Sequence, residues 1–449
     1  MSAILIDSLP SHGAPFTPDQ QALLAHERRK SRLFRIWIAT GIFFMVLPGT
    51  ILGFTNLLLI SAHHGFTGLS PAWIQAHGHS QVFGWIGSFV LGIGFYSQPR
   101  TRANQGRLPI LCWSLWAAGL TFHWLAGAYL WQWRITLPLS GLLELTAVLL
   151  FLYAASQHKL PAASAIQAVQ PRPRPRMEPW MQTVLASNFA FLIAIAVNFG
   201  IGIRLAIQGI TPARPHDFDQ RYLVLLAWGF LAPLVWGFSA RWLPTFLGTK
   251  PIRGRVLQYA LAADLLGVIL GVSGYTLAAS VLVAAATVLA AIAVRIFSRA
   301  ERPAKTIGIH RSFPFFLRTA YMWSILAALL GIVASLADHH GGIWGGSRHA
   351  LTVGFAAMMV MTVGPRILPH FAGVRGIWSR KLMFATLLFL LAGCTLRVSM
   401  EPLAYEGYLY AAWKVLPVSG YLELTAVLLF ALQLVLTFIR EPGIFADAR

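Results

Sequence analysis

The sequence predicts an all-α polytopic membrane protein with about twelve transmembrane helices, arranged as three pseudo-repeats of four helices. Hydrophobic residues make up 57% of the 449 residues and charged residues only 11%. Apolar stretches of about twenty residues recur along the whole chain, which is the length that a helix needs to cross a bilayer. The stretches also resemble one another in sequence. The basic residues between them lie mostly in alternate loops, which places them on one side of the membrane. These observations leave no room for a sizeable soluble domain.

Each predicted span is an apolar run bounded by polar, proline or glycine residues. We expect spans near residues 34–60, 79–97, 108–131, 136–156, 181–206, 222–243, 256–273, 277–297, 315–336, 350–368, 382–398 and 408–438. The predicted organisation is a cytoplasmic N-terminal segment (1–33), a single transmembrane domain (34–440) with repeats at 34–157, 181–297 and 315–440, and a cytoplasmic tail (441–449).

The formal charge of +20 is distributed unevenly between alternate loops. When "HERRKSR" (His26 to Arg32) is placed on the cytoplasmic side, 28 of the 35 Lys and Arg residues fall on that side. This asymmetry is the positive-inside pattern of membrane proteins, so the basic residues set topology and do not indicate nucleic-acid binding. We expect both termini in the cytoplasm and no cleavable signal peptide. Cys112 and Cys394 fall inside predicted spans, which argues against a disulfide framework.

The first and third units of the chain are duplicates. When His79 is aligned with His349, Gly84 aligns with Gly354 five residues later. Further along the same units, "LSGLLELTAVLLF" matches "VSGYLELTAVLLF" at 11 of 13 positions. Close helix packing in lipid explains the matched glycines, but it does not explain the matched histidines.

A middle copy lies between these two units. "GFLAPLVWGFSARWLPTFLG" from Gly229 aligns with "GFAAMMVMTVGPRILPHFAG" from Gly354, and Val224 takes the place of the histidine. The repeating unit is therefore four helices long. Because an even number of spans preserves orientation, the pattern disfavours transporters built from inverted repeats.

His79 and His349 are the strongest candidate ligands, because they hold the same place in two repeats at the outer end of a span. Imidazole is a common ligand of haem iron, copper and zinc, and ionisable groups within a membrane are expensive enough to indicate function. One histidine on each side of a flat cofactor would hold haem b without any cysteine. His77 precedes His79 by two residues and points elsewhere on a helix, so we assign it to a second metal or to a propionate.

Four further histidines gather on the outer side, in "SAHHG" and "DHHGG". These candidate metal ligands are His63, His64, His339 and His340. The alternative is that they are exposed loop residues without a function.

Several polar residues fall deeper in the spans. Glu144 and Glu423 occupy the same repeat position, and His123 aligns with Arg397. A buried carboxylate must be paired, protonated or coordinating, so these residues favour a cofactor site, with a structural hydrogen bond between helices as the alternative. Arg348 and Arg397 lie near the outer interface, where they would bind propionates or extend to the membrane surface.

The segments "HGHSQVFGWIGSFVLGIGFYSQPR" and "RHALTVGFAAMMVMTVGPRILPHFAG" resemble the signature helices of the NnrS family. Its members are bacterial twelve-helix membrane proteins described as containing haem and copper and linked to the nitric oxide response. The resemblance covers nearly the whole chain, and "HALTVG" with the downstream Arg366 is its most specific part. In the family an acidic residue usually follows the first motif, whereas Ser80 and Gln81 follow it here. The resemblance implies the bacterial inner membrane and a link to denitrification.

The arrangement of three units of four helices is also similar to the catalytic subunit of haem–copper oxidases and nitric oxide reductases. In those proteins histidines on spans two and ten hold a low-spin haem, which implies His79 and His349 here. Their copper site takes histidines from spans six and seven, but residues 222–243 and 256–272 contain none. We therefore do not expect the usual binuclear centre. If copper binds, the outer loop histidines are the remaining candidates.

We expect a haem-binding inner-membrane protein, with copper as a second metal, that acts in the response to or tolerance of nitric oxide and nitrosative stress. Its expected partners are the lipid bilayer and nitric oxide or a related small molecule, and not nucleic acid. One alternative is a transporter of a metal, haem or small solute that captures its cargo at the outer histidines. Another is a quinol-linked oxidoreductase. No set of residues defines a turnover mechanism, so the sequence leaves open whether the protein is an enzyme.

Overall fold

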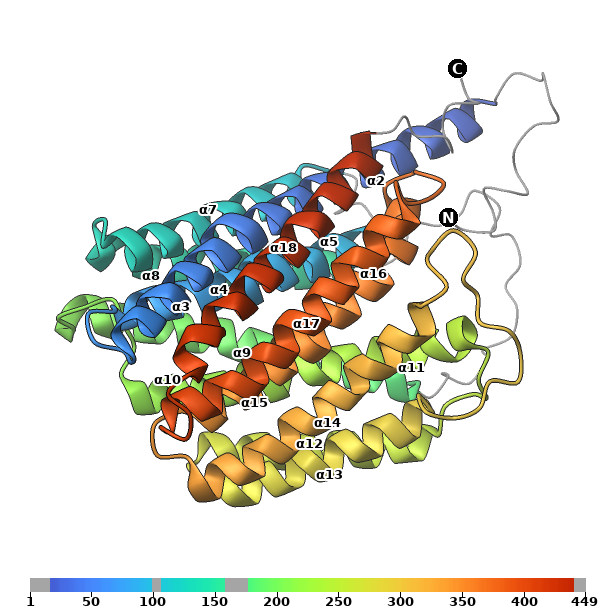
Figure 1. Cartoon of the computed structure of the whole chain (residues 1–449). Coiled ribbons are helices and arrows are strands. Elements are labelled where there is room, and N and C mark those ends of the chain that lie inside the picture. The colour runs from blue at the N-terminus through green and yellow to red at the C-terminus, as the bar shows by residue number, and fades with distance from the viewer. Residues whose placement is uncertain (1–16, 99–105, 158–176, 440–449) are drawn as a thin grey trace.

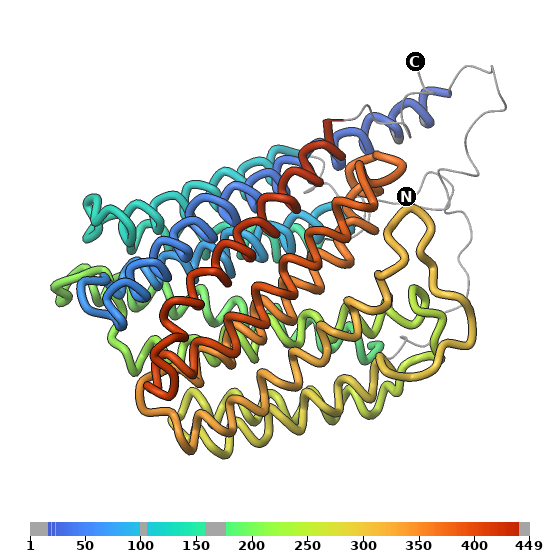
Figure 2. Tube along the Cα trace, viewed as in Figure 1, coloured from blue at the N-terminus to red at the C-terminus, as the bar shows by residue number. Residues whose placement is uncertain are grey.

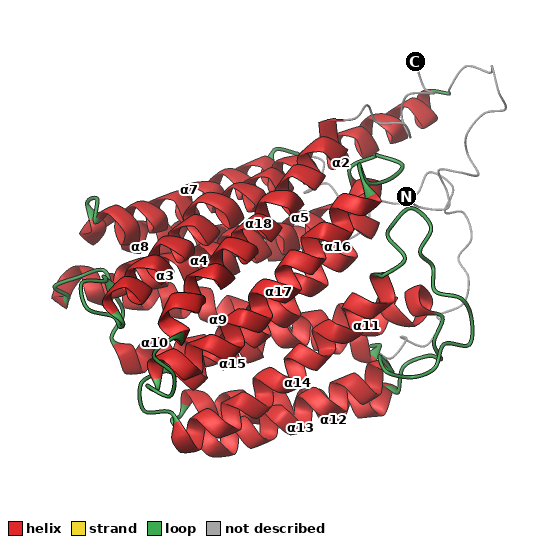
Figure 3. Ribbon diagram, in the orientation of Figure 1, coloured by secondary structure: helices red, strands yellow, loops and turns green. Residues whose placement is uncertain are grey.

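The computed structural model describes residues 17–98, 106–157 and 177–439, and all regular structure in these ranges is helical (Figure 3). Eleven helical runs in this part of the chain are long and apolar enough to cross a membrane. The predicted all-helical membrane fold is confirmed at this level. The predicted cytoplasmic tail (441–449) and residues 1–16 of the predicted N-terminal segment lie outside the described residues.

The described helices form twelve continuous runs, four in each predicted repeat. The first repeat contains α2 (Pro18–Phe44), η1 (Met45–Ile51) and α3 (Leu52–His63) in one run, α4 (Pro71–His79), η2 (Ser80–Gly87) and α5 (Ser88–Ser97) in the next, then α7 (Leu108–Tyr129) and α8 (Trp133–Ser156). The second contains α9 (Pro179–Gln208), a run of α10 (His216–Val224), η3 (Leu225–Leu231) and α11 (Ala232–Leu247), then α12 (Gly254–Val272) and α13 (Thr276–Val294). The third contains α14 (Phe313–Ala337), a run of α15 (Gly342–His349), η4 (Ala350–Ala357) and α16 (Met358–Phe371), then α17 (Arg380–Tyr405) and α18 (Ala412–Ile439). The run from Pro71 to Ser97 is not among the eleven apolar spans, so a twelfth crossing stays a prediction.

The first helix begins well before the predicted start of the first span. Thr17 caps α2, because its hydroxyl accepts a hydrogen bond from the backbone N–H of Gln20 while the Gln20 side chain accepts one from the Thr17 N–H. This reciprocal pair satisfies two of the donors that a helix start leaves open. Part of the segment predicted to precede the membrane is therefore the first part of α2.

The helices run side by side along one direction, and their connecting loops gather at two ends of the bundle (Figure 1). The first turns of α2 and the last turns of α18 lie at the same end (Figure 2). Arg35 of α2 holds the first and third repeats together there. Its guanidinium donates to the carbonyl oxygen of Ala372 at 2.5 and 3.1 Å and to that of Phe438 at 3.2 Å. Ala372 and Phe438 lie near the ends of α16 and α18. The Arg35 guanidinium therefore ties the first repeat directly to the third through charged hydrogen bonds.

The second run of every repeat contains a π-helical segment. The segments η2, η3 and η4 directly follow His79, Val224 and His349, which are the three positions that the sequence alignment equates. A π-helical turn holds an extra residue and so redirects the side chains on either side of it. The two aligned histidines therefore share the same local backbone setting.

The matched glycines bring each π-helical segment against the first helix of its own repeat. A Cβ added to Gly84 would lie 2.6 Å from the Phe44 side chain, and one added to Gly354 would lie 2.6 Å from that of Trp323. In the middle repeat the corresponding contact joins Gly229 to α9. Small residues permit this close approach of helices in lipid, where packing is the main attraction between them.

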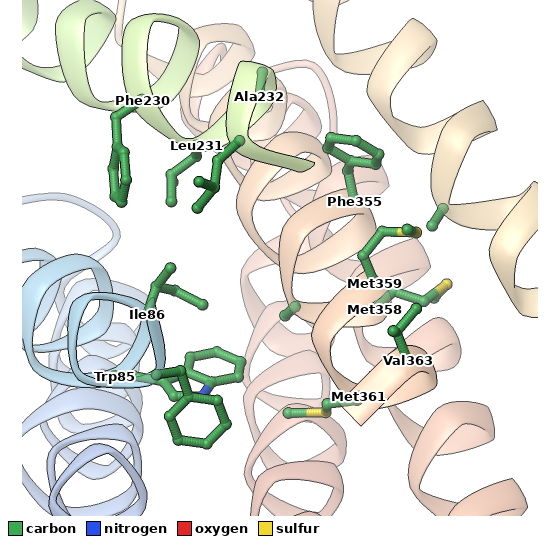
Figure 4. Close-up of a cluster of buried hydrophobic side chains, with 14 of the residues drawn as sticks. Trp85, Ile86, Phe230, Leu231, Ala232, Phe355, Met358, Met359, Met361 and Val363 are labelled. Carbon is green, nitrogen blue, oxygen red and sulfur yellow. The ribbon is translucent and has the colours of Figure 1, made fainter. Parts of the chain in front are cut away.

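Apolar side chains from the three π-helical runs pack together in one buried core (Figure 4). Ile86 of η2, Leu231 of η3 and Phe355 of η4 take part, and Met358 and Met359 extend the core along α16. Phe83 of η2 also belongs to this core and stacks on His79. His79 and His349 each lie directly before a π-helical segment.

Replacing Gly354 with alanine should destabilise the protein, because the new methyl group would overlap the Trp323 side chain. Overpacking of this kind costs about 1–3 kcal/mol. Gly78→Ala is the matched control, since a Cβ at that helical position meets nothing within 4 Å. Thermal melting of the detergent-purified variants should show a lower Tm for Gly354→Ala only, and equal melting of the two variants would contradict this packing.

Candidate functional site

The loop before α15 is held by two carboxylates that position the helix. Asp338 accepts hydrogen bonds from the backbone N–H groups of Gly341 at 2.5 Å and Trp344 at 2.6 Å. Glu406, which follows α17, accepts from the backbone N–H groups of His339, His340 and Gly342 at 3.1, 3.2 and 3.1 Å. These bonds satisfy the open donors of the helix start and tie α15, with His349 at its end, to α17.

The imidazole of His349 is oriented through Nδ1. This atom lies 2.9 Å from the carbonyl oxygen of Gly345 and 2.9 Å from Oε2 of Glu401. The side chain is 25% exposed, and Nε2 has no hydrogen-bond partner among the described residues. A ring fixed through Nδ1 by a carbonyl or carboxylate, with Nε2 open, is the usual arrangement of a metal-binding histidine.

Charged residues from α17 and α18 surround this histidine. Nε of Arg397 lies 3.1 Å from Oε2 of Glu401, and both side chains are buried. Glu423 is within electrostatic range of His349 and Arg397, and its Oε1 atom is buried without a partner in the described chain. Arg397 is therefore paired inside the protein and does not extend to the membrane surface. Sequence reasoning missed Glu401, although its spacing of four residues from Arg397 is typical of an ion pair on one helix.

His77 lies on the side of α4 that faces η1. Its Nδ1 atom is 2.8 Å from the carbonyl oxygen of Gly49, and its Nε2 atom has no hydrogen-bond partner among the described residues. His77 is within electrostatic range of both His349 and Arg397. His77 and His349 are therefore both held through Nδ1, His77 by a carbonyl oxygen of η1 and His349 by one of its own helix and by Glu401.

His79 belongs to a different set of residues, formed within the first repeat. Its Nε2 atom lies 2.9 Å from Oε1 of Glu144 in α8. Its ring stacks on that of His123 in α7 at 3.5 Å between centroids and on Phe83 at 4.4 Å. Ser140 Oγ lies 3.4 Å from His123 Nδ1. No hydrogen bond or ring contact in the described chain joins His79 to His349, and the haem pair of these two residues stays a prediction.

The two sets use the same helix packing with different polar residues. An added Cβ at Gly119 would meet Cγ of Glu144 at 2.8 Å, and one at Gly393 would meet Cγ of Glu423 at 2.7 Å. The carboxylate of Glu401, however, has no counterpart in the first repeat, where Gly127 is the residue four positions after His123. His79 consequently pairs with the aligned carboxylate of its repeat, whereas His349 pairs with an additional one.

A small cavity of about 10 Å³, room for about one water molecule, is lined by His123 and Gly127. Arg214, from the segment between α9 and α10, also lines it and is held by Asp219 at 2.8 Å and by Asn198 at 3.3 Å. No spacing in the sequence relates Arg214 to either partner. The cavity connects this segment with the histidine set of the first repeat.

His63 and His64, the outer histidines of the first repeat, contact different groups and, among the described residues, do not share a potential metal site with each other. Nδ1 of His63 lies 3.0 Å from the carbonyl oxygen of Leu59. His64 ends α3 with a left-handed backbone, and its ring contacts Tyr410 and Trp413. Their predicted role as copper ligands stays a prediction.

His339 and His340 contribute backbone N–H groups to Glu406, as described above. Arg348 donates a hydrogen bond to Gln220 and so connects the third repeat with α10. Among the described residues, one group of three or more potential ligands lies close enough to hold a single metal ion, and it consists of His79, His123 and Glu144.

Comparison with known proteins gives one match. Residues 249–439 match the model of a family described as a domain of unknown function (DUF8744). No curated protein matches the chain. The matched region covers α12 to α18 and so includes His349, Arg397 and Glu401, whereas His77 and the set around His79 lie outside it.

Acidification should release the loop before α15. Partial burial raises the pKa of Glu406, but hydrogen bonds donated by the backbone N–H groups of His339, Gly342 and His340 outweigh this and leave the pKa below its ordinary value of 4.5. Because the folded-state pKa is the lower one, the stabilisation is present above pH 4.5 and disappears as the pH falls through the folded-state value.

Glu406→Gln should therefore lower the Tm of the detergent-purified protein at pH 7, by an amount equivalent to about 1 kcal/mol for a lost cap. The difference from the native chain should shrink below pH 4.5. Glu178→Gln, an exposed residue just before α9, is the control. A constant difference between the native chain and Glu406→Gln across this pH range would contradict the role of the carboxylate.

Proposed function

We propose that this chain is a membrane protein that binds haem b between its first and third repeats, with His77 and His349 as the two iron ligands. The observation that carries the proposal is that both histidines are held through Nδ1. Each has Nδ1 within 2.9 Å of a glycine carbonyl oxygen and an Nε2 atom without a hydrogen-bond partner in the described chain. They come from the second helical runs of two different repeats and lie within electrostatic range of one another.

The donor set fits haem b. Two neutral imidazoles are sufficient to hold this iron, and no thiolate is required. Cys112 and Cys394 are both buried free thiols. His79 fits this role less well, because Phe83 and His123 cover its ring and Glu144 takes its Nε2 atom. We therefore assign the second ligand to His77 in place of His79.

The charged residues around the site have separate tasks. Glu401 accepts from Nδ1 of His349, which keeps the proton on that atom and leaves Nε2 free to coordinate. Arg397 compensates Glu401 at 3.1 Å and retains further N–H groups that suit a propionate. Arg348 is the second candidate for a propionate. Because Arg397 and Glu401 neutralise each other, both can stay charged inside the bundle. An isolated charge within the membrane would be strongly destabilising.

When bound, a haem in such a site supplies one-electron transfer and, after loss of one ligand, an iron that binds nitric oxide. We assign the protein to the response to or tolerance of nitric oxide, as its resemblance to the NnrS family implies. Its three-by-four arrangement, similar to that of haem–copper oxidases, supports the choice of ligands from the first and third repeats. The distribution of its basic residues supports a bacterial inner membrane location with cytoplasmic termini.

Copper held by the outer loop histidines stays part of this proposal as a second metal. Transport of a metal, haem or small solute, with capture at the outer histidines, is the second candidate function. A third candidate is a quinol-linked oxidoreductase, which would use the same haem. Reduction of the haem by a quinol analogue would distinguish this function from the other two.

Visible spectra of the detergent-purified protein test the haem proposal. Oxidised and dithionite-reduced spectra of the native chain, expressed with ample haem, should show b-type bands. His77→Ala and His349→Ala should each lower the haem content at least about tenfold, because loss of one axial ligand removes most of the binding free energy. His79→Ala, on the same helix, is the matched comparison and should keep its haem.

Two results would overturn this assignment. Loss of haem from His79→Ala with retention in His77→Ala would restore the pair expected from the sequence. A colourless native protein would reject the haem site and make transport the leading function. If haem binds, addition of nitric oxide to the reduced protein should change its spectrum, and an unchanged spectrum would reject the role in the nitric oxide response.

A further inference from the structure

We propose that His79, His123 and Glu144 form a separate metal centre in the first repeat, which binds one divalent transition-metal ion. The centre is distinct from the His77–His349 pair and does not depend on it. It is also distinct from the outer loop histidines, since all three of its residues are buried.

The donor atoms have the chemistry and spacing of a metal site. Two imidazole nitrogens and one carboxylate oxygen all lie within 4.8 Å of one another. The same donors hold catalytic zinc and, with open positions, iron(II). Metal–ligand distances of about 2.0–2.2 Å place neighbouring ligands roughly 3 Å apart, and His79 Nε2 already lies 2.9 Å from Glu144 Oε1. One imidazole must turn out of the stacked pair to direct its lone pair at the ion.

Unpartnered buried atoms supply independent support. Oε2 of Glu144 and Nδ1 of His79 have no hydrogen-bond partner in the structure, although Glu144 is 0% and His79 4% exposed. A buried carboxylate with an unpaired oxygen is costly, and most costly within a membrane. A bound cation compensates the carboxylate charge and takes its free oxygen. Such orphaned groups in a packed structure commonly indicate a missing ion or water.

The third repeat shows why only the first holds this centre. Arg397 occupies the position of His123 and bears a positive charge that would repel a cation. In the first repeat the corresponding charge is absent, because Arg397 is replaced by His123 and Glu401 by Gly127. Arg214 lines the small cavity beside His123, and the Asp219 carboxylate at 2.8 Å offsets its charge.

Zinc binding to the detergent-purified full chain tests the centre. The protein is stripped with a chelator, incubated with Zn²⁺, passed over a desalting column and assayed for bound zinc by elemental analysis. To remove competition from the loops, the parent chain carries alanine at His63, His64, His339 and His340. It should retain about one zinc per chain, as a single four-coordinate site would, and Zn²⁺ should raise its Tm.

His123→Ala and Glu144→Gln in this parent should each bind less than about a tenth of that zinc and lose the rise in Tm. Glu423→Gln, the aligned carboxylate of the third repeat, is the matched control and should bind zinc as the parent does. Size-exclusion profiles identify any variant that fails to fold, and His123→Asn then replaces it as the smaller change. Equal zinc in the parent, His123→Ala and Glu144→Gln would overturn the proposal, as would a folded parent that binds none.

Discussion

The structure depends on one constraint, which is that a polar side chain within a lipid-embedded bundle must find its partner inside the protein. His79 meets this constraint through Glu144 at 2.9 Å, and His349 through Glu401 at the same distance. The helices that carry these residues are therefore fixed relative to one another by more than apolar packing. The constraint is not fully met at Glu144, Glu423 and Asp264, whose buried carboxylates each have an oxygen without a partner in the described chain, and the first two belong to the candidate sites.

The three repeats show how one packing arrangement supports different sites. Gly84 and Gly354 hold the π-helical runs against the first helix of their repeats in the same way. The polar residues have nevertheless diverged, since the middle repeat has Val224 in place of the histidine and packs it against Gly271. The middle repeat thus contributes an apolar side chain at this position, while the first and third repeats contribute the candidate ligands. The repeats keep the same helix packing but differ in their polar residues. This explains why His79 pairs with Glu144 whereas His349 pairs with Glu401.

The sequence alone predicted the helical membrane fold, because apolar length and composition decide that question. It also identified the aligned residues His79, Val224 and His349, directly after which the π-helical segments begin, since duplication is visible without a structure. It placed His79, His123 and Glu144 among the polar residues of interest but did not join them into one set. That step requires the packing of α4 against α7 and of α7 against α8, which no pattern within a single span contains.

The choice between His77 and His79 shows the same limit. Two residues on a helix point in different directions, so the sequence indicates that only one of them can face the third repeat. Which one does so depends on the helices that pack on each side of α4. In the structure His77 faces η1 and His79 faces α7 and α8. Sequence reasoning also could not supply Glu401, because its role follows from contact with His349 across two helices.

The central claim is that the two histidines of α4 serve two separate centres. A high-resolution cryo-electron microscopy map of the detergent-purified protein, expressed with ample haem and zinc, tests this most directly. The account predicts a flat density that joins Nε2 of His77 to Nε2 of His349, and a compact density among His79, His123 and Glu144. A single cofactor density joining His79 to His349 would contradict the account, and so would well-resolved histidines with no density at either centre.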